Sequence, residues 1–308
     1  MNFLYCLDEN YNIQSFISIL SLLENCNEKI NLFIIHKNPK SFSKYISKIE
    51  NHQSLNKIQI YKFKSYANFP NLDNVHVSEA TYYRLYIEDY IKDEIDSIVY
   101  LDGDTVILKN ITEEFIEIIT KLKRSEYIIS VKPEFVSDDH LQKLRMKSSE
   151  YFNAGVMFID FKKWSQSEIC QKLQIIQKEI YESINFWDQD VLNSFFDGKY
   201  LSLDENNNFK VDVDDRNQTM IPNSVNLIHY MGKSKPWTVR GVLNPNSTYY
   251  QEIYRDYFSL PYHISTNWKM QAYNDLITIM KNSKNYQLEN KFGLILSVFY
   301  FLIKKRGK

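Results

Sequence analysis

Residues 97–108 read SIVYLDGDTVIL, an apolar stretch interrupted by an Asp-Gly-Asp turn. Ser97–Leu101 predicts a buried strand, and Asp102 and Asp104 follow directly at its end. Two carboxylates one residue apart on a tight turn can converge on a hard divalent cation, and such a cation can bridge to phosphates. The alternative is a β-hairpin, for which Asp-Gly between apolar runs is a strong signal. Asp104 favours the cation site, because a plain turn needs no second carboxylate and two close like charges repel each other.

The strand before this turn lies in a longer alternation of apolar runs and helical periodicity, which covers roughly the first 130 residues. This pattern is typical of β-α-β units on a largely parallel sheet, which is a nucleotide-binding architecture. Asn2–Leu7 and Ile30–Ile35 are expected strands, joined by a helix whose apolar residues recur at i, i+3, i+4 and i+7 from Ile13. Because ligands of open α/β sheets lie beyond the carboxyl ends of the strands, the turn Asp8-Glu9-Asn10-Tyr11 is a candidate site.

The remaining predicted elements continue the same pattern. They are a helix near 41–52, a strand near 57–63, a helix opened by Ser78, a strand through 153–160, a helix near 167–182, a helix from about Trp187 and a strand ending at Tyr230. The sequence contains no internal repeat. After about residue 241 the pattern becomes less regular.

The composition is that of a compact globular protein. The 308 residues are 44% hydrophobic and 24% charged, and the 7 Gly and 7 Pro leave little room for flexible linkers. A net charge of −1 provides no global basic field, so we expect no nucleic-acid partner. Three scattered cysteines exclude a disulfide scaffold and fit a reducing compartment. The N-terminus lacks a basic region and soon reaches a carboxylate at Asp8, so we expect no signal peptide and a cytoplasmic chain.

A later apolar strand ends at a histidine, His229, and is followed by Gly232 and Lys235. Imidazole is a common ligand for transition metals such as Mn²⁺, although a lone histidine on a strand is more often a core or surface residue. Gly232 allows a close approach of the backbone. Lys235 supplies a point charge suited to a diphosphate, or is an ordinary solvated lysine.

Four further residues fit either a binding role or a purely structural one. Asn153 precedes two small residues that leave space for a ligand against the sheet or mark a bulge. Asp188 and Asp190 open a helix, where the structural alternatives are an N-cap and a complement to the helix dipole. Arg84 holds phosphate or sugar, or covers the sheet edge with its stem.

These signals occur in one particular order along the chain. The order is Asp8-Glu9-Asn10-Tyr11, Tyr83-Arg84-Leu85, Asp102-Gly103-Asp104, Asn153-Ala154-Gly155, Asp188-Gln189-Asp190, and His229-Tyr230 with Gly232 and Lys235-Pro236-Trp237. From about residue 2 to 240 this order resembles glycosyltransferase family 8. The family includes bacterial lipopolysaccharide galactosyl- and glucosyltransferases and, more distantly, glycogenin.

The resemblance implies an α/β protein with the GT-A fold. It predicts a Rossmann-like nucleotide-binding core with a mixed central sheet, followed by a C-terminal helical extension. The catalytic domain is expected over residues 1–240, and the extension over residues 241–308.

The resemblance also implies a set of ligand-binding residues. Mn²⁺, or Mg²⁺ in its place, would be held by Asp102, Asp104 and His229 against the diphosphate of UDP-galactose or UDP-glucose. Asp8 and Asn10 match the positions that hold uracil and ribose, and Gly232 and Lys235 match the diphosphate clamp. The residues expected to bind the donor are Asp8, Asn10, Tyr11, Arg84, Asp102, Gly103, Asn153, Gly232 and Lys235. Cys6 departs from the family, in which a small alanine-like residue is more familiar.

The activity implied by the resemblance is retaining transfer of a hexose from a UDP-sugar to a hydroxyl of a glycan acceptor. The default acceptor is a bacterial surface polysaccharide, lipopolysaccharide or glycoprotein glycan. Gln189 would steady positive charge at the anomeric carbon and Asp188 would orient donor hydroxyls. Asp190 is an alternative nucleophile.

Two other classes of function compete with this interpretation. A nucleotidyltransferase that makes nucleotide sugars usually carries a Gly-rich phosphate loop, but residues 1–30 contain no glycine. A non-catalytic UDP-sugar-binding protein would keep the fold and lose its metal ligands. Asp102, Asp104 and His229 are all present.

The last part of the chain is an apolar run, Phe292–Ile303, followed by four basic residues among the final five. Twelve residues are too few to span a hydrocarbon core, which needs about 20. One interpretation is an element buried against the domain, interrupted only by Ser297. The other is peripheral membrane attachment, in which the apolar run enters the interface while Lys304, Lys305, Arg306 and Lys308 contact anionic lipid.

Overall fold

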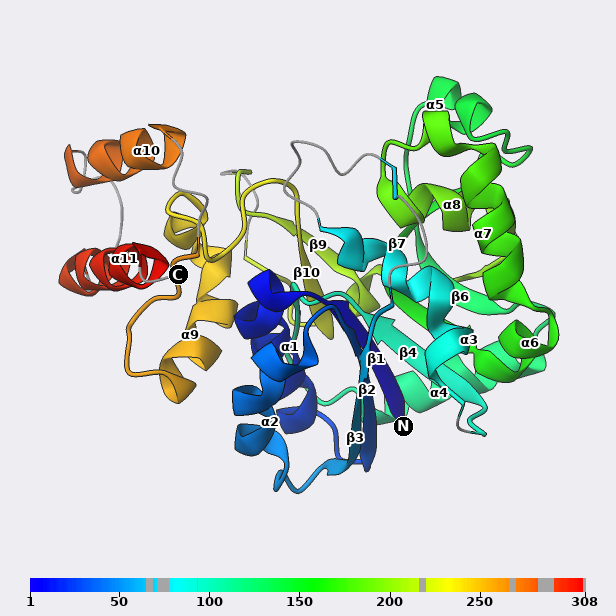
Figure 1. Cartoon of the computed structure of the whole chain (residues 1–308), viewed down its shortest axis with the longest axis horizontal. Helices are drawn as coiled ribbons and strands as arrows, with labels where there is room; N and C mark the ends of the chain where they lie inside the picture. Colours follow the sequence, from blue (N-terminus) through cyan, green and yellow to red (C-terminus); the bar gives the residue numbers. More distant parts are fainter. Residues whose placement is uncertain are drawn as a thin grey trace.

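The computed structural model of the chain describes residues 1–64, 69–70, 78–92, 94–215, 220–265, 270–281 and 291–306, with the side chains of all of these except 271, 291 and 304–306. A seven-stranded sheet forms its centre, in the order β3-β2-β1-β4-β7-β6-β8 (Figure 1). The strands are β1 (Asn2–Leu7), β2 (Ile30–His36), β3 (Leu55–Lys62), β4 (Ser97–Leu101), β6 (Ile129–Glu134), β7 (Tyr151–Asp160) and β8 (Leu201–Ser202).

The direction of the strands changes across this sheet. β3, β2, β1 and β4 are parallel, as the β-α-β pattern of the first half of the chain predicts. β7 runs antiparallel to both of its neighbours, β4 and β6. The sheet is therefore mixed, as the family resemblance implies.

A second sheet of three strands, β5-β10-β9, stands beside the first. Its strands are β5 (Thr105–Ile107), β9 (Phe209–Asp212) and β10 (Leu227–Met231). The hairpin interpretation of the Asp-Gly-Asp turn is wrong, because β4 and β5 belong to different sheets. The chain leaves the large sheet at Asp102, and the amide of Thr105 donates to the carbonyl oxygen of Asp102 at 3.2 Å. The turn therefore stands where the two sheets meet.

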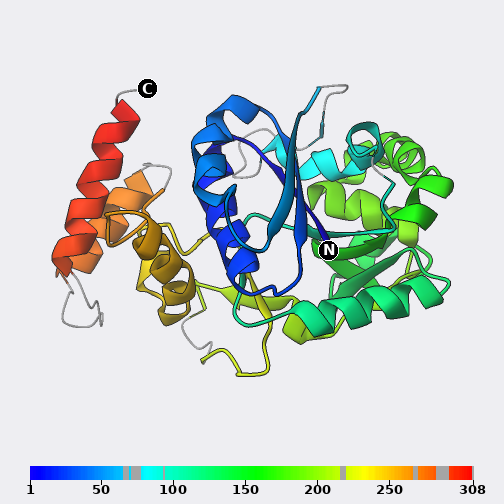
Figure 2. The same cartoon turned by 90° about the horizontal axis from the view of Figure 1, so that it is seen from below.

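Hydrophobic clusters cover both faces of the large sheet. β1 alternates between them: Phe3, Tyr5 and Leu7 join one cluster, and Leu4 joins the other. The first cluster includes side chains of α1 (Asn12–Glu24), α2 (Ser43–Ile49), α4 (Thr112–Arg124) and α9 (Thr248–Tyr257). The second includes side chains of the 3-10 helix η3 (Glu79–Tyr86), α3 (Ile87–Tyr90), α5 (Asp138–Lys143), α6 (Phe161–Gln166), α7 (Ile169–Glu179) and α8 (Trp187–Phe196). Figures 1 and 2 show the helices arranged around the sheet.

Two of the predicted helices begin differently from what the sequence suggests. Ser78 does cap the helix that it opens, since its side chain accepts from the amide of Ala80, but that helix is 3-10. The tighter winding places residues three apart on one side, and Tyr83 and Tyr86 both pack on the ring of Phe63. In α8 the N-cap is Phe186 with no side-chain bond, so the N-cap interpretation of Asp188 is wrong.

The C-terminal helices are divided between two clusters. Helix α9 packs on α1, with the ring of Tyr257 5.9 Å from that of Phe16. Helices α10 (Met270–Lys281) and α11 (Lys291–Arg306) form a third cluster with Val239, Val242, Tyr262 and Ile264, at one end of the molecule (Figure 2). Among the described residues, no helix is both long enough and apolar enough to cross a membrane.

Helix α1 carries a buried serine stripe that its apolar periodicity conceals. Ser18 and Ser21 are completely buried. The hydroxyl of Ser18 lies 3.0 Å from that of Tyr5 and 2.9 Å from that of Thr105, so it joins β1 to the Asp-Gly-Asp turn. The hydroxyl of Ser21 accepts from the amide of Ile107 at 3.0 Å. Ser21 therefore supplies an acceptor at the outer edge of β5, where none of the described strands pairs with it.

We expect Ser21→Ala to lower the free energy of unfolding by about 1–3 kcal/mol, because the buried amide of Ile107 then loses its acceptor. Urea titration followed by circular dichroism measures this. Ser47→Ala is the matched control, since Ser47 is exposed on α2. Equal midpoints for Ser21→Ala, Ser47→Ala and the unmodified chain would show that water reaches Ile107 instead.

Candidate active site

A cleft of about 580 Å³ opens at the carboxyl ends of β1, β4, β6 and β10. Most residues singled out in the sequence line it. These are Asp8, Tyr11, Arg84, Asp102, Gly103, Asp104, Asn153, Asp188, Gln189, His229, Gly232 and Lys235. Asn10 and Asp190 do not line it. Because β7 is antiparallel, its first residues, including Asn153, reach the same edge as the ends of the parallel strands.

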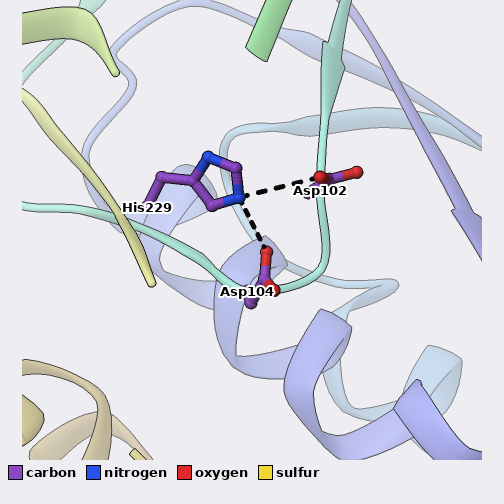
Figure 3. Close-up of side chains that lie close together, drawn as sticks. All are labelled: Asp102, Asp104 and His229. Carbon is purple, nitrogen blue, oxygen red and sulfur yellow. Dashed lines mark ion pairs between the residues drawn. The ribbon is translucent and has the colours of Figure 1, made fainter. Parts of the chain in front are cut away.

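Three side chains at this edge form a candidate metal centre. Asp102 and Asp104 come from the turn between the sheets, and His229 comes from the middle of β10 (Figure 3). Nε2 of His229 lies 3.2 Å from Oδ1 of Asp104 and 3.7 Å from Oδ2 of Asp102. One possible ligand atom from each residue lies within 4.8 Å of the others, a spacing that suits a single ion.

A hydrogen bond on the far side of the imidazole sets its tautomer. Nδ1 of His229 lies 3.1 Å from Oδ1 of Asn208, whose amide nitrogen donates in turn to Oδ1 of Asn153 at 3.0 Å. Because Oδ1 of Asn208 can only accept, Nδ1 of His229 carries the proton. Nε2 of the neutral ring then presents its lone pair to the two carboxylates.

This arrangement fits a bound cation. A lone pair that faces two anionic oxygens is repelled by them, and a cation between the three makes every contact attractive. Oδ1 of Asp104 is buried and makes no hydrogen bond with any residue that the structure describes. An imidazole nitrogen and two carboxylate oxygens together can bind a divalent metal ion.

Lys235 fixes the charge of the second carboxylate. Its Nζ lies 2.8 Å from Oδ2 of Asp104 and also donates to the carbonyl oxygen of Tyr230. Burial, the largest single influence, raises the pKa of Asp104, but Lys235 and His229 together outweigh it and hold this pKa below its ordinary value. Asp104 is therefore ionised, as a metal ligand must be.

Gly155 leaves the space that the imidazole ring occupies. A β-carbon at this position would lie 2.0 Å from Cε1 of His229 and 2.9 Å from Oδ2 of Asp102. The small residues after Asn153 therefore admit protein side chains of the metal centre, and the ligand-space interpretation needs this refinement.

Arg84 connects the metal centre to the other side of the cleft. Its Nη2 lies 3.3 Å from Oδ1 of Asp102, its Nε lies 2.5 Å from Oδ2 of Asp188, and its guanidinium stacks 4.1 Å above the ring of Tyr100. Burial raises the pKa of Asp188 to about 6 although Arg84, and a hydrogen bond from Thr81, favour the charged form. Burial disfavours the charge of Arg84, but Asp188 and other anionic neighbours raise its pKa overall. Arg84 is thus a buried, permanent cation, and the sheet-edge interpretation is wrong.

Gln189 lies across the cleft with both ends of its amide held. Oε1 accepts from the amide of Ala154 at 3.0 Å and from Nδ2 of Asn153 at 3.3 Å. Nε2 donates to the hydroxyl of Tyr151 at 3.2 Å. The orientation of the amide is therefore fixed before any ligand binds.

Asp190 is placed quite differently from its two neighbours in sequence. It is completely buried, and its carboxylate accepts from Tyr151, His140 and the amides of Asn185 and Phe186. A carboxylate that is enclosed by donors and does not line the cleft cannot attack a sugar held there, so the alternative nucleophile role is not supported.

The first turn of the chain forms the opposite wall. The carboxylate of Asp8 accepts from the amide of Asn10 at 2.9 Å and caps the 3-10 helix η1 (Glu9–Tyr11). The ring of Tyr11 meets that of Trp237 edge-on at 5.8 Å. Gly232 adopts a φ of 83°, which favours glycine, in the loop that leads from β10 to Lys235.

Several residues of the site escape detection in the sequence. Asn208 orients His229, but it ends a run of three asparagines that reads as an ordinary loop. Glu134 and Phe135 line the cleft at the end of β6, but the apolar pattern of this strand does not indicate a binding role for them. These positions become visible only once the strand order is known.

Solved structures show what kind of fold this is. The galactosyltransferase LgtC, in complex with donor and acceptor sugar analogues, is similar with a TM-score of 0.67 and 20% identity over 89% of this chain and all of that one. The glycosyltransferase GlyE of Streptococcus pneumoniae in its apo form is similar with a TM-score of 0.59 and 22% identity, over 84% of this chain and 63% of that one. The fold is therefore the GT-A fold of glycosyltransferases.

Sequence comparison gives the family. A lipopolysaccharide 1,2-glucosyltransferase of Escherichia coli is 26% identical over 97% of this chain and 89% of its own length. A lipopolysaccharide 1,3-galactosyltransferase of Salmonella typhimurium is 31% identical over 56% of this chain and 52% of its own length. The family model for glycosyl transferase family 8 matches residues 2–240, and the chain belongs to this family. The family resemblance and the α/β GT-A fold are thus confirmed, and the chain is a glycosyltransferase.

We expect Gly155→Ala to abolish binding of Mn²⁺ while the protein stays folded, because the added methyl group displaces the ring of His229. Electron paramagnetic resonance of free Mn²⁺ measures the binding, and circular dichroism checks the fold. Val156→Ala is the control, since the side chain of Val156 belongs to the core on the other face of β7. Wild-type Mn²⁺ affinity in Gly155→Ala would show that these three side chains do not form the metal site.

Proposed function

We propose that this chain is a retaining, metal-dependent glycosyltransferase that moves galactose or glucose from a UDP-sugar to a hydroxyl of a bacterial surface glycan. The observation that carries this proposal is the metal centre, where Asp102, Asp104 and His229 converge beside Lys235. The relatives named above act on lipopolysaccharide, and LgtC binds donor and acceptor analogues. We propose the same classes of donor and acceptor for this chain.

The proposed division of roles follows the two sides of the cleft. Asp8 and Tyr11 border the side proposed for the nucleoside, and Asn10 lies on the same turn without lining the cleft. When bound, Mn²⁺ or Mg²⁺ would stabilise the negative charge that grows on the departing diphosphate. Lys235 adds a fixed positive charge for the same leaving group, with Gly103 and Gly232 leaving room for it.

The donor sugar is proposed to lie between Arg84 and Gln189. Asp188, held by Arg84, and Asn153 supply acceptors and donors for its hydroxyls. The Oε1 atom of Gln189 is held by donors from Ala154 and Asn153, and its partial negative charge is suited to steady positive charge at the anomeric carbon. A neutral amide is a poor nucleophile, so we favour attack by the acceptor hydroxyl from the leaving-group side, which keeps the anomeric configuration. The departing phosphate oxygen takes the hydroxyl proton, and no separate base is needed.

The competing functions are less well supported. The first βα turn lacks the glycine-rich loop of nucleotidyltransferases, and it is closed by the Asp8 cap instead. A binding protein without catalysis has no need of an ionised, buried Asp104 held between Lys235 and His229.

We expect the purified chain to release UDP from UDP-galactose or UDP-glucose with Mn²⁺ present, and to lose this activity with a chelator. Lys235→Ala should lower the rate by about 100-fold, since it removes charge stabilisation of the leaving group. Lys233→Ala is the matched control, because Lys233 also borders the cleft but is exposed. With an acceptor, nuclear magnetic resonance of the product should show an α-linkage.

The outcomes of this experiment separate the parts of the proposal. Release of UDP that survives the chelator would overturn the metal dependence. Equal small losses for the two lysine variants would show that Lys235 is an ordinary surface charge. A β-linked product would overturn the retaining mechanism.

We further propose that residues 1–240 form the catalytic domain and that the extension, residues 241–308, brings it to anionic membrane lipid at the cytoplasmic face. Helix α11 has two apolar sides. Leu294 and Val298 are buried in the third cluster and Ser297 is buried beside them in the sequence, whereas Phe299 and Ile303 are 60% and 70% exposed. The buried-element and interface interpretations of this segment therefore apply to opposite sides of one helix.

The basic residues that follow suit an anionic surface. Lys304, Lys305, Arg306 and Lys308 come directly after the exposed apolar side chains in the sequence. Each contributes on the order of 1 kcal/mol when it lies near anionic lipid. Truncation is a poor test, because the other side of α11 is part of a hydrophobic cluster.

We expect the full chain to co-sediment with phosphatidylglycerol-containing vesicles at low salt, and less at high salt. The double variant Phe299→Ser with Ile303→Ser should remain in the supernatant with an unchanged thermal midpoint, because both residues are exposed. Met220→Ser is the matched control, since Met220 is exposed elsewhere on the molecule. A wild-type chain that stays in the supernatant at low salt would end the membrane proposal.

A further inference from the structure

The backbone just before the sugar-facing pair Asp188 and Gln189 is strained. Trp187, the first residue of α8, has a φ of 52°, in the left-handed region that a bulky side chain rarely adopts. Such a conformation persists only where the surrounding structure holds it. Because Asp188 and Gln189 follow Trp187 in the chain, its conformation sets the direction in which they enter the cleft.

The buried carboxylate of Asp190 accepts hydrogen bonds from the backbone of this turn. Its Oδ2 accepts from the amides of Asn185 and Phe186, each at 2.7 Å. These are the two residues before Trp187. Oδ2 of Asp190 therefore holds the backbone just before Trp187, and Oδ1 remains available to side chains.

Those side chains come from two other elements. Oδ1 of Asp190 accepts from the hydroxyl of Tyr151, at the start of β7, at 2.6 Å. It also accepts from Nε2 of His140, on α5, at 2.8 Å. Nδ1 of His140 lies 3.3 Å from Nδ2 of Asn185, so this ring nitrogen is the acceptor and Nε2 carries the proton.

The hydroxyl of Tyr151 connects Asp190 to Gln189, which lines the cleft. It has one proton, and it gives that proton to Asp190. It must therefore accept from Nε2 of Gln189, which lies at 3.2 Å. That contact turns Oε1 of Gln189 toward Ala154 and the sugar side of the cleft. A freely rotating hydroxyl could instead donate to Oε1 of Gln189, and would then pair with either end of the amide.

We propose that His140, Tyr151 and Asp190 form a positioning unit that fixes the orientation of the Gln189 amide and the strained turn before it. The unit rests on the proposed role of Gln189 at the donor sugar. None of its members touches the substrate, since Asp190, Tyr151 and His140 do not line the cleft. It acts on the rate of transfer and leaves binding of the nucleotide unchanged.

The test compares variants of the full chain in Mn²⁺-dependent release of UDP from UDP-galactose or UDP-glucose. Tyr151→Phe and His140→Leu should lower kcat by about 10- to 100-fold, the cost of a misplaced reacting group, with KM and the Kd of UDP within about twofold of wild type. His140→Gln keeps an N–H donor and should recover most of the rate. Leu122→Ala, a cavity variant in α4 that does not line the cleft, controls for loss of stability.

Hydrogen exchange supplies a readout that does not depend on activity. The amides of Asn185 and Phe186 should exchange faster in His140→Leu, and protection should return in His140→Gln. Unchanged exchange in His140→Leu overturns the proposal, as does an equal loss of kcat in His140→Leu and His140→Gln. If the wild-type chain releases no UDP from either donor, the proposed function fails, and the exchange measurement still decides whether the positioning unit exists.

Discussion

The active-site edge is organised around one close contact, in which Nε2 of His229 faces two carboxylates. Asn208 fixes a proton of His229 on Nδ1, so that Nε2 of the neutral ring faces Asp102 and Asp104 with a lone pair. A proton on Nε2, or a cation at the centre of the three groups, makes these contacts attractive. Three features of the fold place these groups together. β4 ends directly before Asp102, β10 carries His229, and Gly155 lacks the side chain that would collide with the imidazole ring.

The fixed charges around this centre suit the diphosphate and the metal of the proposed function. Three carboxylates, those of Asp102, Asp104 and Asp188, face two permanent cations, Arg84 and Lys235. The protein alone therefore keeps one negative charge in excess, which attracts a divalent cation. With that cation the balance becomes positive, which attracts the phosphates of the donor. If the proposed function holds, metal and nucleotide would each favour the binding of the other through this charge balance.

The sequence was sufficient for features that depend on local pattern and for motifs that recur in the family. The strands through Asn2–Leu7 and Ser97–Leu101, and the residues of the candidate metal centre, follow from periodicity and from the resemblance. It was insufficient where a residue acts through a distant partner. Asn208 resembles a loop asparagine until β9 pairs with β10, and Ser21 resembles a helix interruption until β5 needs an acceptor. Asp190 shares a motif with Gln189, yet only its burial separates a positioning group from a nucleophile.

Residues beyond 240, where the match to the family ends, also contribute to the packing behind the cleft. Trp237 meets Tyr11 on the donor side at 5.8 Å and Tyr250 of α9 at 4.9 Å. His263 packs against Tyr250 and, at 5.3 Å, against Phe301 of α11. A continuous series of rings therefore leads from the wall proposed for the nucleoside to the C-terminal helix. Because packed interiors transmit displacement, a membrane that holds α11 would also hold the loop that carries Lys235, so that attachment and catalysis act on the same element.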